Sequence, residues 1–550
     1  MYDGVGIHLE IHTDTRRRTP YHYGLFRQSF RREGRVCKRT RGRVTGLGLP
    51  QLKALRAFLQ KGCPDLEGAC GQVLGSREYG ASAAVLGLAR ELGLDRMLYS
   101  RNETWVRHIL AMVVGRLVYQ GSKLSLVNRW RDTALWDLVG LGGARPDVDL
   151  CYEAMDDLLA RQEAIQKKLA AGRLRDGCLI LYDVTSSYME GEYAASDLVA
   201  YGHNRDGKRG HEQIVIGLMT DKEGCPVGAE VYPGNTADQT TVMDRVAELK
   251  GRYGLSDLVL AGDRGMLTAA RLKDVSQAGL KTITALTHPQ MQALLSRGVI
   301  QLGLFDERDI AEVVDPEHPE VRYMLCKNPE TAEREGRTRA ALLGKTVEAL
   351  QKLQARKRPI AEEDLAAKVG EVLGKWKMKK FLTWGIREGR LHYEVEEAKV
   401  KSEEALDGCY VVRTDVGGEK LSKGEAVASY RRLAKVEAAI RQLKTVQLEV
   451  RPVYHHKDER IRAHVFLCVL AYWLEWHLLE RLRPLFEEDG EGKDRRWTLE
   501  GVLERLKAIR VERTRYLDIE CELLTVPDVE QQRLLDLIGV PLEGPTGKDV

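Results

Sequence analysis

The chain contains Cys178-Leu-Ile-Leu-Tyr-Asp183 and, further on, Leu258-Val-Leu-Ala-Gly-Asp263, two short apolar runs that each end in an aspartate. Runs of this length and composition predict buried β-strands. Around them, segments of period 2 alternate with segments of helical period, which indicates a sheet with packed helices. Strands are predicted at 178–188, 211–220, 226–233, 257–262 and 281–287, and helices at 236–252 and 267–279.

A third acidic residue, Glu437, lies on a predicted helix, with Tyr430 and Lys444 seven residues before and after it. Two carboxylates after apolar strands and one on a later helix are the ligands that a pair of hard cations needs. Mg²⁺ prefers oxygen ligands and readily shares phosphate oxygens. Two such ions about 4 Å apart activate a water or hydroxyl and stabilise the leaving oxygen of a phosphodiester. The sequence therefore predicts that Asp183, Asp263 and Glu437 form a metal-binding catalytic trio.

The helix that carries Glu437 is predicted to be amphipathic. At about 100° per residue, Tyr430, Glu437 and Lys444 cluster within about 40° of one another, on the margin of an apolar stripe. Arg441 follows Glu437 by one turn and is placed to pair with it. For this segment alone, an ordinary surface helix with an exposed ion pair is the alternative. The residues of the stripe are Leu433, Val436, Ile440 and Leu443.

Four blocks of the chain carry a family resemblance. They are Tyr182-Asp-Val-Thr-Ser-Ser-Tyr188, Pro233-Gly-Asn-Thr-Ala-Asp238, Asp263-Arg-Gly-Met266 and Tyr430-Arg-Arg-Leu-Ala-Lys-Val-Glu437, the last continuing to Lys444. In this order they resemble the DDE transposases of bacterial insertion sequences. More narrowly, the last block resembles the Tyr, Arg, Glu, Lys signature of the IS-four-like superfamily. The resemblance runs from about residue 20 to about residue 480, nearly the whole chain.

The resemblance implies a fold and a reaction. The two aspartates are expected on neighbouring strands of an RNase H-like core, where the trio holds two Mg²⁺ ions, for which Mn²⁺ can substitute. One ion activates a water that cuts the element's end, and the freed 3′-OH then attacks target DNA. Tyr430 and Lys444 are expected to contact the DNA backbone near the metals. The family's Arg corresponds to Leu433 here, and Arg441 is a better-placed cation than Arg432.

A polar, basic and turn-rich loop precedes the second predicted strand. It contains Arg205, Lys208 and Arg209, which are predicted to hold DNA phosphates near the site. Family members have a similar segment between the first two strands. A solvated hairpin loop is the alternative.

Other candidate contacts lie outside the predicted core. Lys123 and Arg129, in a helical region, are predicted to recognise DNA ends, with ordinary surface charge as the alternative; Ser122 or Ser125 is a candidate N-cap there. Trp384, in a later strand-like run, is a candidate for stacking on a flipped base, against simple packing.

Charge is distributed unevenly along the chain. The net charge of +4 does not itself predict a nucleic-acid partner. From Arg16 to Arg43, however, there are eleven Lys or Arg and a single acidic residue, Glu33. Such a block attracts phosphates through counterion release. Tyr and Phe residues interleave with these arginines, as in a small folded β module; a disordered basic arm is the alternative.

The cysteines and the apolar segments bound the class of protein. Ten cysteines without a CxxC pair predict reduced, mostly buried thiols, and Cys63 and Cys70 lack a nearby His for a zinc site. The most apolar helix, His464 to Leu479, is shorter than the roughly 20 residues of a membrane span. His464 is expected to be a satisfied core histidine. A soluble, cytoplasmic bacterial protein, associated with the nucleoid when bound to DNA, is expected.

The chain exceeds one typical hydrophobic core, so it is predicted to be multidomain. The 173 residues between Asp263 and Glu437 must include an insertion. The predicted fold class is multidomain α/β, an RNase H-like mixed sheet flanked by helices and interrupted by that insertion. The predicted segments are a basic N-terminal module (1–60), a helical DNA-binding region (61–175), the first part of the core (176–289), the insertion domain (290–426), the second part of the core (427–480) and a helical tail (481–550).

The residues and the resemblance together predict a DNA transposase of an insertion sequence. Its expected partners are double-stranded DNA, at the terminal inverted repeats and at the target, and a second copy of the chain in a dimeric synaptic complex. Two alternatives stay open. An RNase H-like nuclease or resolvase cuts DNA without joining it, and a catalytically silent, domesticated DNA-binding protein does neither.

Overall fold

The structure, a computed structural model, contains two compact units, each described here on its own. Unit 1 comprises Met1–Leu174, Asp183–Ala237 and Lys435–Val550, and unit 2 comprises Arg175–Tyr182 and Asp238–Ala434. The structure describes residues 7–14, 21–32, 35–61, 72–205, 207, 210–305, 310–356, 361–444, 450, 454–490, 495–516 and 519–542.

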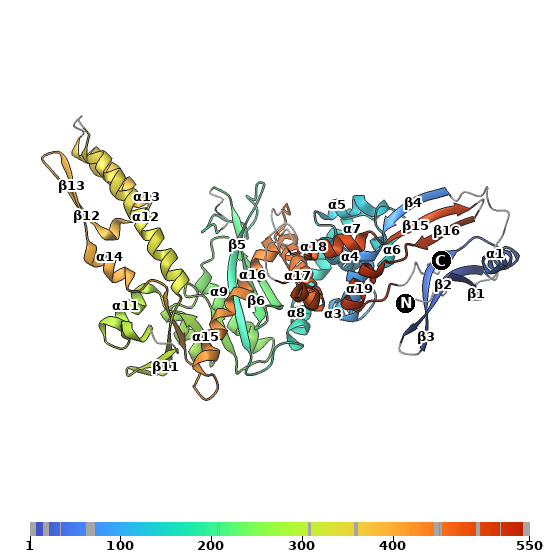
Figure 1. Ribbon diagram of the computed structural model, residues 1–550, viewed down its shortest axis with the longest axis horizontal. Helices are drawn as coiled ribbons and strands as arrows, with labels where there is room; N and C mark the ends of the chain where they lie inside the picture. The colour runs from blue at the N-terminus through green and yellow to red at the C-terminus, as the bar shows by residue number, and fades with distance from the viewer. Residues whose placement is uncertain are drawn as a thin grey trace. The chain divides into compact units, whose positions relative to one another are not determined.

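Unit 2 is built on a mixed β-sheet (Figure 1). In the parallel part of the sheet, β8 lies between β9 and the first four residues of β5. The antiparallel strands β14, β11 and β10 follow β9 in that order. Nearly every position of the parallel strands is buried, as expected where both faces of a sheet are covered. The strands are β5 (Leu179–Tyr188), which belongs to this unit up to Tyr182, and β8 (Val259–Gly262), β9 (Lys281–Ala285), β10 (Ala311–Asp315), β11 (His318–Lys327) and β14 (Cys409–Thr414).

Helices α9 (Asp238–Gly251), α10 (Ala269–Gln277) and α15 (Lys423–Arg431) pack on this sheet. Tyr182 in β5 donates from its hydroxyl to Thr241 Oγ1 in α9 at 2.8 Å, which fixes that helix against the strand. All five strands and both helices predicted around the two aspartates are present, with ends within two residues of the prediction. The mixed sheet with its helices fits the RNase H-like fold.

The segment predicted as an insertion domain has two parts. Three of its strands, β10, β11 and β14, extend the sheet of unit 2, so this part is continuous with the core's strands and does not form a separate sheet. The remainder packs around its own apolar cluster, which includes Leu350, Val369 and Phe381. The elements of that remainder are α12 (Pro329–Gln354), α13 (Glu362–Lys375), β12 (Leu382–Arg387), β13 (Arg390–Val395) and α14 (Glu397–Glu404).

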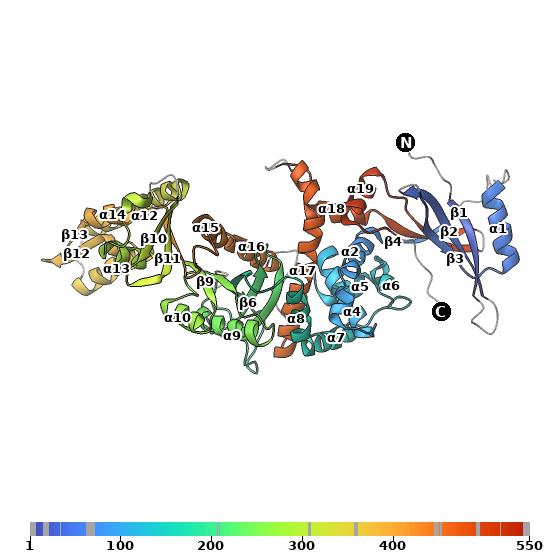
Figure 2. The same ribbon diagram turned by 90° about the horizontal axis from the view of Figure 1, so that it is seen from below.

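Unit 1 contains a six-stranded antiparallel sheet that joins both ends of the described chain (Figure 2). The strand order is β1-β2-β3-β16-β15-β4. Helix α1 (Leu49–Lys61) covers one face around Leu9, Phe26 and Leu52. The basic block therefore does fold as a β module. The strands are β1 (Ile7–Asp14), β2 (Tyr21–Arg32), β3 (Arg35–Val44), β4 (Gln72–Glu78), β15 (Arg510–Tyr516) and β16 (Ile519–Leu524).

This sheet corrects two predictions. The segment 481–550 is not a purely helical tail, because β15 and β16 lie within it, beside α18 (Leu499–Lys507) and α19 (Val529–Ile538). The helical region 61–175 likewise contains a strand, β4. β15 is rich in charged residues, so its composition does not predict a strand, and its partner β4 lies far away in the chain.

The rest of unit 1 is a helical region and a hairpin. The long helix α17 (Asp458–Glu488) packs on α4 and α7, and it also contacts β7. Ser122 is the N-cap of α5, where its hydroxyl accepts from Ser125 N at 3.1 Å. The hairpin strands are β6 (Gln213–Asp221) and β7 (Pro226–Pro233), and the principal helices are α2 (Gly80–Glu91), α4 (Thr104–Val118), α5 (Lys123–Asn128), α7 (Val148–Ala160) and α8 (Gln162–Ala171).

The Pro-Gly-Asn turn after β7 is a tightly packed structural element. A Cβ on Gly234 would lie 2.0 Å from the carbonyl oxygen of Gln213, and one on Gly202 would lie 2.0 Å from that of Gly234. Gln213 Nε2 also donates to Gly234 O at 2.8 Å. Only glycine allows backbones to approach this closely. The block therefore shapes the turn before α9.

No helix in the described ranges has the length and apolar character needed to cross a bilayer. The cysteines that the structure describes are all free, and most are buried, which confirms the prediction of reduced thiols. Cys63 and Cys70 lie outside the described residues.

Candidate active site

Asp183 lies in the middle of β5 and not at its end. The strand continues because Val184 to Ser187 are all buried and remain in the sheet. Tyr182 faces α9, so the alternation of side chains along a strand directs Asp183 to the opposite face. Val184 N donates to Asp183 Oδ1 at 2.7 Å, and the carboxylate is partly exposed.

Asp263 directly follows β8 and is exposed. Its carbonyl oxygen accepts from Met266 N and Leu267 N, at 3.0 and 3.1 Å, so a tight turn holds its backbone. The parallel register pairs Tyr182 with Gly262. Asp183 therefore directly follows Tyr182, and Asp263 directly follows Gly262, the residue paired with Tyr182 on the neighbouring parallel strand.

Glu437 lies on α16 (Leu433–Lys444) and is exposed. The predicted apolar stripe of this helix is confirmed, since Leu433, Val436, Ile440 and Leu443 are all buried. Two contacts fix α16 within unit 1. Lys435 pairs with Glu223 in the turn between β6 and β7, and Gln442 Nε2 donates to Glu475 Oε1 on α17 at 2.5 Å.

The helix before Glu437 differs from the prediction. Tyr430 belongs to α15, which ends at Arg431, and a turn at Arg432 separates it from α16. The break has a packing cause, because α15 packs on strands of unit 2 whereas α16 packs on elements of unit 1. The angular cluster computed for one straight helix therefore holds only for Glu437 and Lys444.

The ion pair between Glu437 and Arg441 is also not formed. Both side chains are exposed, and neither has a hydrogen-bond or ion-pair partner among the described residues. The exposed carboxylate of Asp263 likewise has no hydrogen-bond or ion-pair partner among the described residues. An exposed carboxylate that no cation of the protein neutralises is available to an external cation.

The trio suits a divalent ion by its chemistry, since carboxylate oxygens are the donors that Mg²⁺ prefers. Asp183 and Glu437 belong to unit 1 and Asp263 to unit 2. Within the described part of the chain, no three or more His, Cys, Asp or Glu side chains gather closely enough to hold a metal ion. The assignment of the trio as metal ligands stays a prediction.

Arg205 lies beside the strand of Asp183. Its guanidinium donates to the carbonyl oxygen of Val184, and its backbone N donates to Ser186 Oγ at 2.9 Å. The structure thus brings one predicted phosphate-binding cation to the residue that follows Asp183. The other two cations predicted in this loop, Lys208 and Arg209, lie outside the described residues.

Lys123 does not match its prediction as a surface contact to DNA. It is only 7% exposed, and its Nζ lies 3.0 Å from His455 Nε2 and 2.7 Å from His464 Nδ1. Burial, together with the charge of Arg116, lowers the pKa of Lys123 to about 7. Its role is to join α5 to α17 in the interior, and His464 is a core histidine, as expected.

We therefore expect Lys123→Met to change the affinity for DNA by less than about twofold, because the amine is already engaged by His455 and His464 in the interior. Since the folded protein disfavours the charged amine, the wild type gains stability as pH rises from about 7 toward 10, and the variant loses this gain. Fluorescence anisotropy with duplex DNA and urea unfolding at pH 7 and pH 9 measure the two effects. Several-fold weaker binding by a stably folded variant would restore the assignment to the DNA surface.

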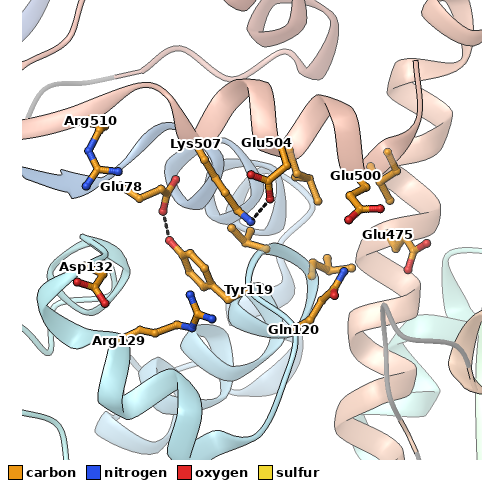
Figure 3. A pocket seen from close by; sticks show the side chains of 14 residues that line it. Glu78, Tyr119, Gln120, Arg129, Asp132, Glu475, Glu500, Glu504, Lys507 and Arg510 are labelled. Atoms are coloured by element: carbon orange, nitrogen blue, oxygen red, sulfur yellow. Dashed lines mark hydrogen bonds and ion pairs between the residues drawn. The ribbon is translucent and has the colours of Figure 1, made fainter. Parts of the chain in front are cut away.

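Arg129 is exposed and lines a pocket of about 620 Å³ in unit 1 (Figure 3). Tyr119 and Lys507 point into the same pocket, and Tyr119 donates to Glu78. Acidic groups outnumber basic ones in the lining, which disfavours a DNA phosphate inside the pocket. The acidic lining residues are Glu78, Asp132, Glu475, Glu500 and Glu504.

Unit 2 also contains a lysine-rich pocket of about 670 Å³, which was not predicted from the sequence. Lys380 and Lys399 have carboxylate partners, whereas Lys377 and Lys379 have none in the described ranges. Trp384, 37% exposed, lines the same pocket. The run Lys375-Trp-Lys-Met-Lys-Lys380 could have indicated a basic site, but a short lysine run on its own is more typical of solvated surface charge.

Two comparisons with known proteins bear on this site. A family model described as "Transposase DDE domain" matches residues 175–474, which span Asp183, Asp263 and Glu437. A comparison with curated proteins finds no match.

Proposed function

The chain belongs to the family of transposases that carry a DDE domain, and from this premise we propose that it binds the ends of an insertion sequence and cuts and joins DNA there. Within the family, we place it in the IS-four-like group with the signature Tyr430, Glu437 and Lys444. A transposase is an enzyme that acts on DNA, and the narrower proposal concerns its substrate and its chemistry.

One structural observation carries the proposal. β5 and β8 are neighbouring parallel strands in register, and each contributes an aspartate directly after the paired residues Tyr182 and Gly262. Parallel strands in register bring such equivalent positions to one level of a sheet. We propose that these two carboxylates act together and that the carboxylate of Glu437 on α16 completes the set that the family's chemistry requires.

Asp183, Asp263 and Glu437 are the residues that we propose hold divalent metal ions, with Mg²⁺ as the physiological ion. DDE domains generally use divalent metals. When bound, such ions lower the pKa of a coordinated water and stabilise the leaving oxygen of a phosphodiester. The protein's own residues would supply negative charge, orient the DNA and exclude competing geometries. No covalent protein intermediate is needed.

Contacts to DNA are proposed on two surfaces. Arg205 at β5 and Arg441 on α16 would hold backbone phosphates near the trio. The lysine pocket of unit 2, with Lys377, Lys379 and the exposed ring of Trp384, combines charge with a stacking surface. A homodimer is proposed for the joining step, because two ends must be held together.

The test is a cleavage and joining assay on a duplex that carries the sequences flanking this gene. With Mg²⁺ we expect nicked or excised element ends and, after addition of target DNA, joined products. Addition of EDTA is expected to remove both, and Mn²⁺ is expected to restore them. Cleavage without joining would favour a nuclease or resolvase, and DNA binding with neither product would favour a silent DNA-binding protein.

A further inference from the structure

Two arginines of β3 place their guanidinium groups in the interior of unit 1. Arg41 is only 5% exposed, and its Nε donates to Gln28 Oε1 on β2 at 2.9 Å. Arg39 is half-buried; it lies 5.1 Å from the ring centre of Phe30 and donates to Gln532 Oε1 on α19 at 3.2 Å. Both arginines thus contact neutral acceptors.

A β-bulge separates these two arginines from the next one. The register of β2 and β3 shifts between Phe26 and Arg27, which leaves Arg41 as the additional residue of β3. Bulges redirect side chains in this way. Arg41 remains on the face of Gln28 and Arg39, whereas Arg43 pairs across from Leu25 and covers the ring of Tyr23 at 4.1 Å.

The hydrogen bonds of the two guanidinium groups are incomplete. Arg39 Nε and Arg41 Nη1 are buried and have no hydrogen-bond partner among the described residues. Burial and the nearby charge of Arg39 lower the pKa of Arg41 to about 10. A buried charge is normally paired with an opposite charge, because desolvation without a partner is costly. Arg39 and Arg41 are two adjacent cations that lack an anionic hydrogen-bond partner, and this favours the binding of an external anion.

The acidic groups near this pair are engaged elsewhere. Asp536 on α19 acts on Arg39 at a distance, but its carboxylate accepts from Gln532 Nε2 at 2.8 Å. Glu10 on β1 accepts from Arg27 at 3.2 Å and is also bound by Lys38. Neither carboxylate completes the hydrogen bonds of Arg39 or Arg41, which leaves both groups able to accept a further partner.

We propose that Arg39 and Arg41 form a binding site for a phosphate group, and that its source is the backbone of DNA. Paired guanidinium groups match the geometry and charge of a phosphate. The phosphate would approach along the exposed part of Arg39 and replace Gln532 Oε1 as the acceptor of its hydrogen bond. The dense basic block of the surrounding hairpin favours a polyanion over a single free phosphate. This inference rests on the proposed function for the identity of its partner.

The test compares Arg41→Met with Arg56→Met in the full chain, since Arg56 is an exposed arginine on α1 of the same module. We expect Arg41→Met to weaken duplex DNA binding about tenfold at roughly 0.1 M salt and to reduce the salt slope by about 1. Arg56→Met is expected to weaken binding by less than about twofold. The free Arg41→Met protein should unfold at the same temperature as wild type or higher, because an unpaired buried charge is removed.

Inorganic pyrophosphate serves as the second probe and separates the two sources of phosphate. If the site takes a DNA phosphate, pyrophosphate competes with DNA on the wild type and not on Arg41→Met. Unchanged DNA affinity of the variant overturns the proposal, whether or not pyrophosphate stabilises the wild type. A lower unfolding temperature with unchanged affinity assigns Arg41 a structural role and overturns it too.

The inference and the proposed function can fail separately. The cleavage readout uses the wild type and Arg56→Met, which lies outside the proposed phosphate site and is expected to show the Mg²⁺-dependent cleavage of the wild type. Normal wild-type cleavage with an ineffective Arg41 substitution rejects the phosphate site alone. Wild-type DNA binding without any cleavage rejects the proposed function and leaves the phosphate site to be judged on affinity.

Discussion

Asp183→Asn is expected to bind DNA that carries the element's end as tightly as wild type, and to cut it at least about 10³-fold more slowly. The substitution exchanges an anionic oxygen for a neutral amide, which removes charge that a divalent ion needs while keeping the size of the side chain. Val184 N, which donates to Asp183 Oδ1 at 2.7 Å, can donate equally well to the amide oxygen of asparagine. The strand is therefore expected to remain intact.

The assay measures cleavage and affinity on the same duplex, with Asp244→Asn as the matched control. Asp244 is an exposed aspartate on α9 with no predicted part in the chemistry. Asp263→Asn and Glu437→Gln are expected to behave as Asp183→Asn does. A parallel loss of binding and cleavage in Asp183→Asn, or an early unfolding transition, would show that the aspartate holds the fold and that the proposed trio is wrong.

Glu475→Gln is expected to stabilise unit 1 strongly above neutral pH. Glu475 is fully buried on α17; its Oε1 accepts from Gln442, and its Oε2 is buried without a partner in the described part of the chain. Burial raises the pKa of this carboxyl to about 7. The folded protein therefore binds the proton more tightly than the unfolded chain does. Stability contributed by the neutral acid is lost as pH rises from about 4.5 to 7.

Above pH 7 the wild type folds with a buried charge that costs about 3 kcal/mol, and glutamine avoids this cost while still accepting from Gln442. The stability difference between variant and wild type should be about 1 kcal/mol or less at pH 5 and about 3 kcal/mol at pH 8. Urea unfolding followed by the fluorescence of Trp473 and Trp476, on the same helix, measures it. Glu459→Gln, an exposed change on α17, is the control. Equal differences at both pH values would contradict the assignment of a neutral buried acid.

The elements around the two aspartates could be predicted from sequence because their signals are local. The apolar run before Asp183 and the one before Asp263 are buried nearly throughout, so composition and length suffice to identify the strands. The stripe on α16 follows from helical period alone and is confirmed. The positions of the three acids along these elements were therefore predictable, and the continuation of β5 past Asp183 agrees with the strand predicted at 178–188.

What could not be predicted depends on contacts between distant segments. Lys123 reads as a surface charge until His455 and His464 enclose it. The break at Arg432 has no glycine or proline to mark it and follows from the different packing of α15 and α16. The environment of Arg39 and Arg41 was equally unpredictable from the sequence. It depends on a bulge in β3 and on α19, a helix almost five hundred residues away in the chain.

The six-stranded sheet of unit 1 sets an order of events during synthesis. β3 ends at Val44, and its neighbour β16 pairs with it through Cys521, Glu522 and Leu523. At about 5–20 residues per second, the ribosome needs tens of seconds to make the intervening chain. During that time the edge of β3 that later pairs with β16 has no strand partner. A nascent chain therefore completes this sheet only once β16 has been translated, and a prematurely terminated one never does.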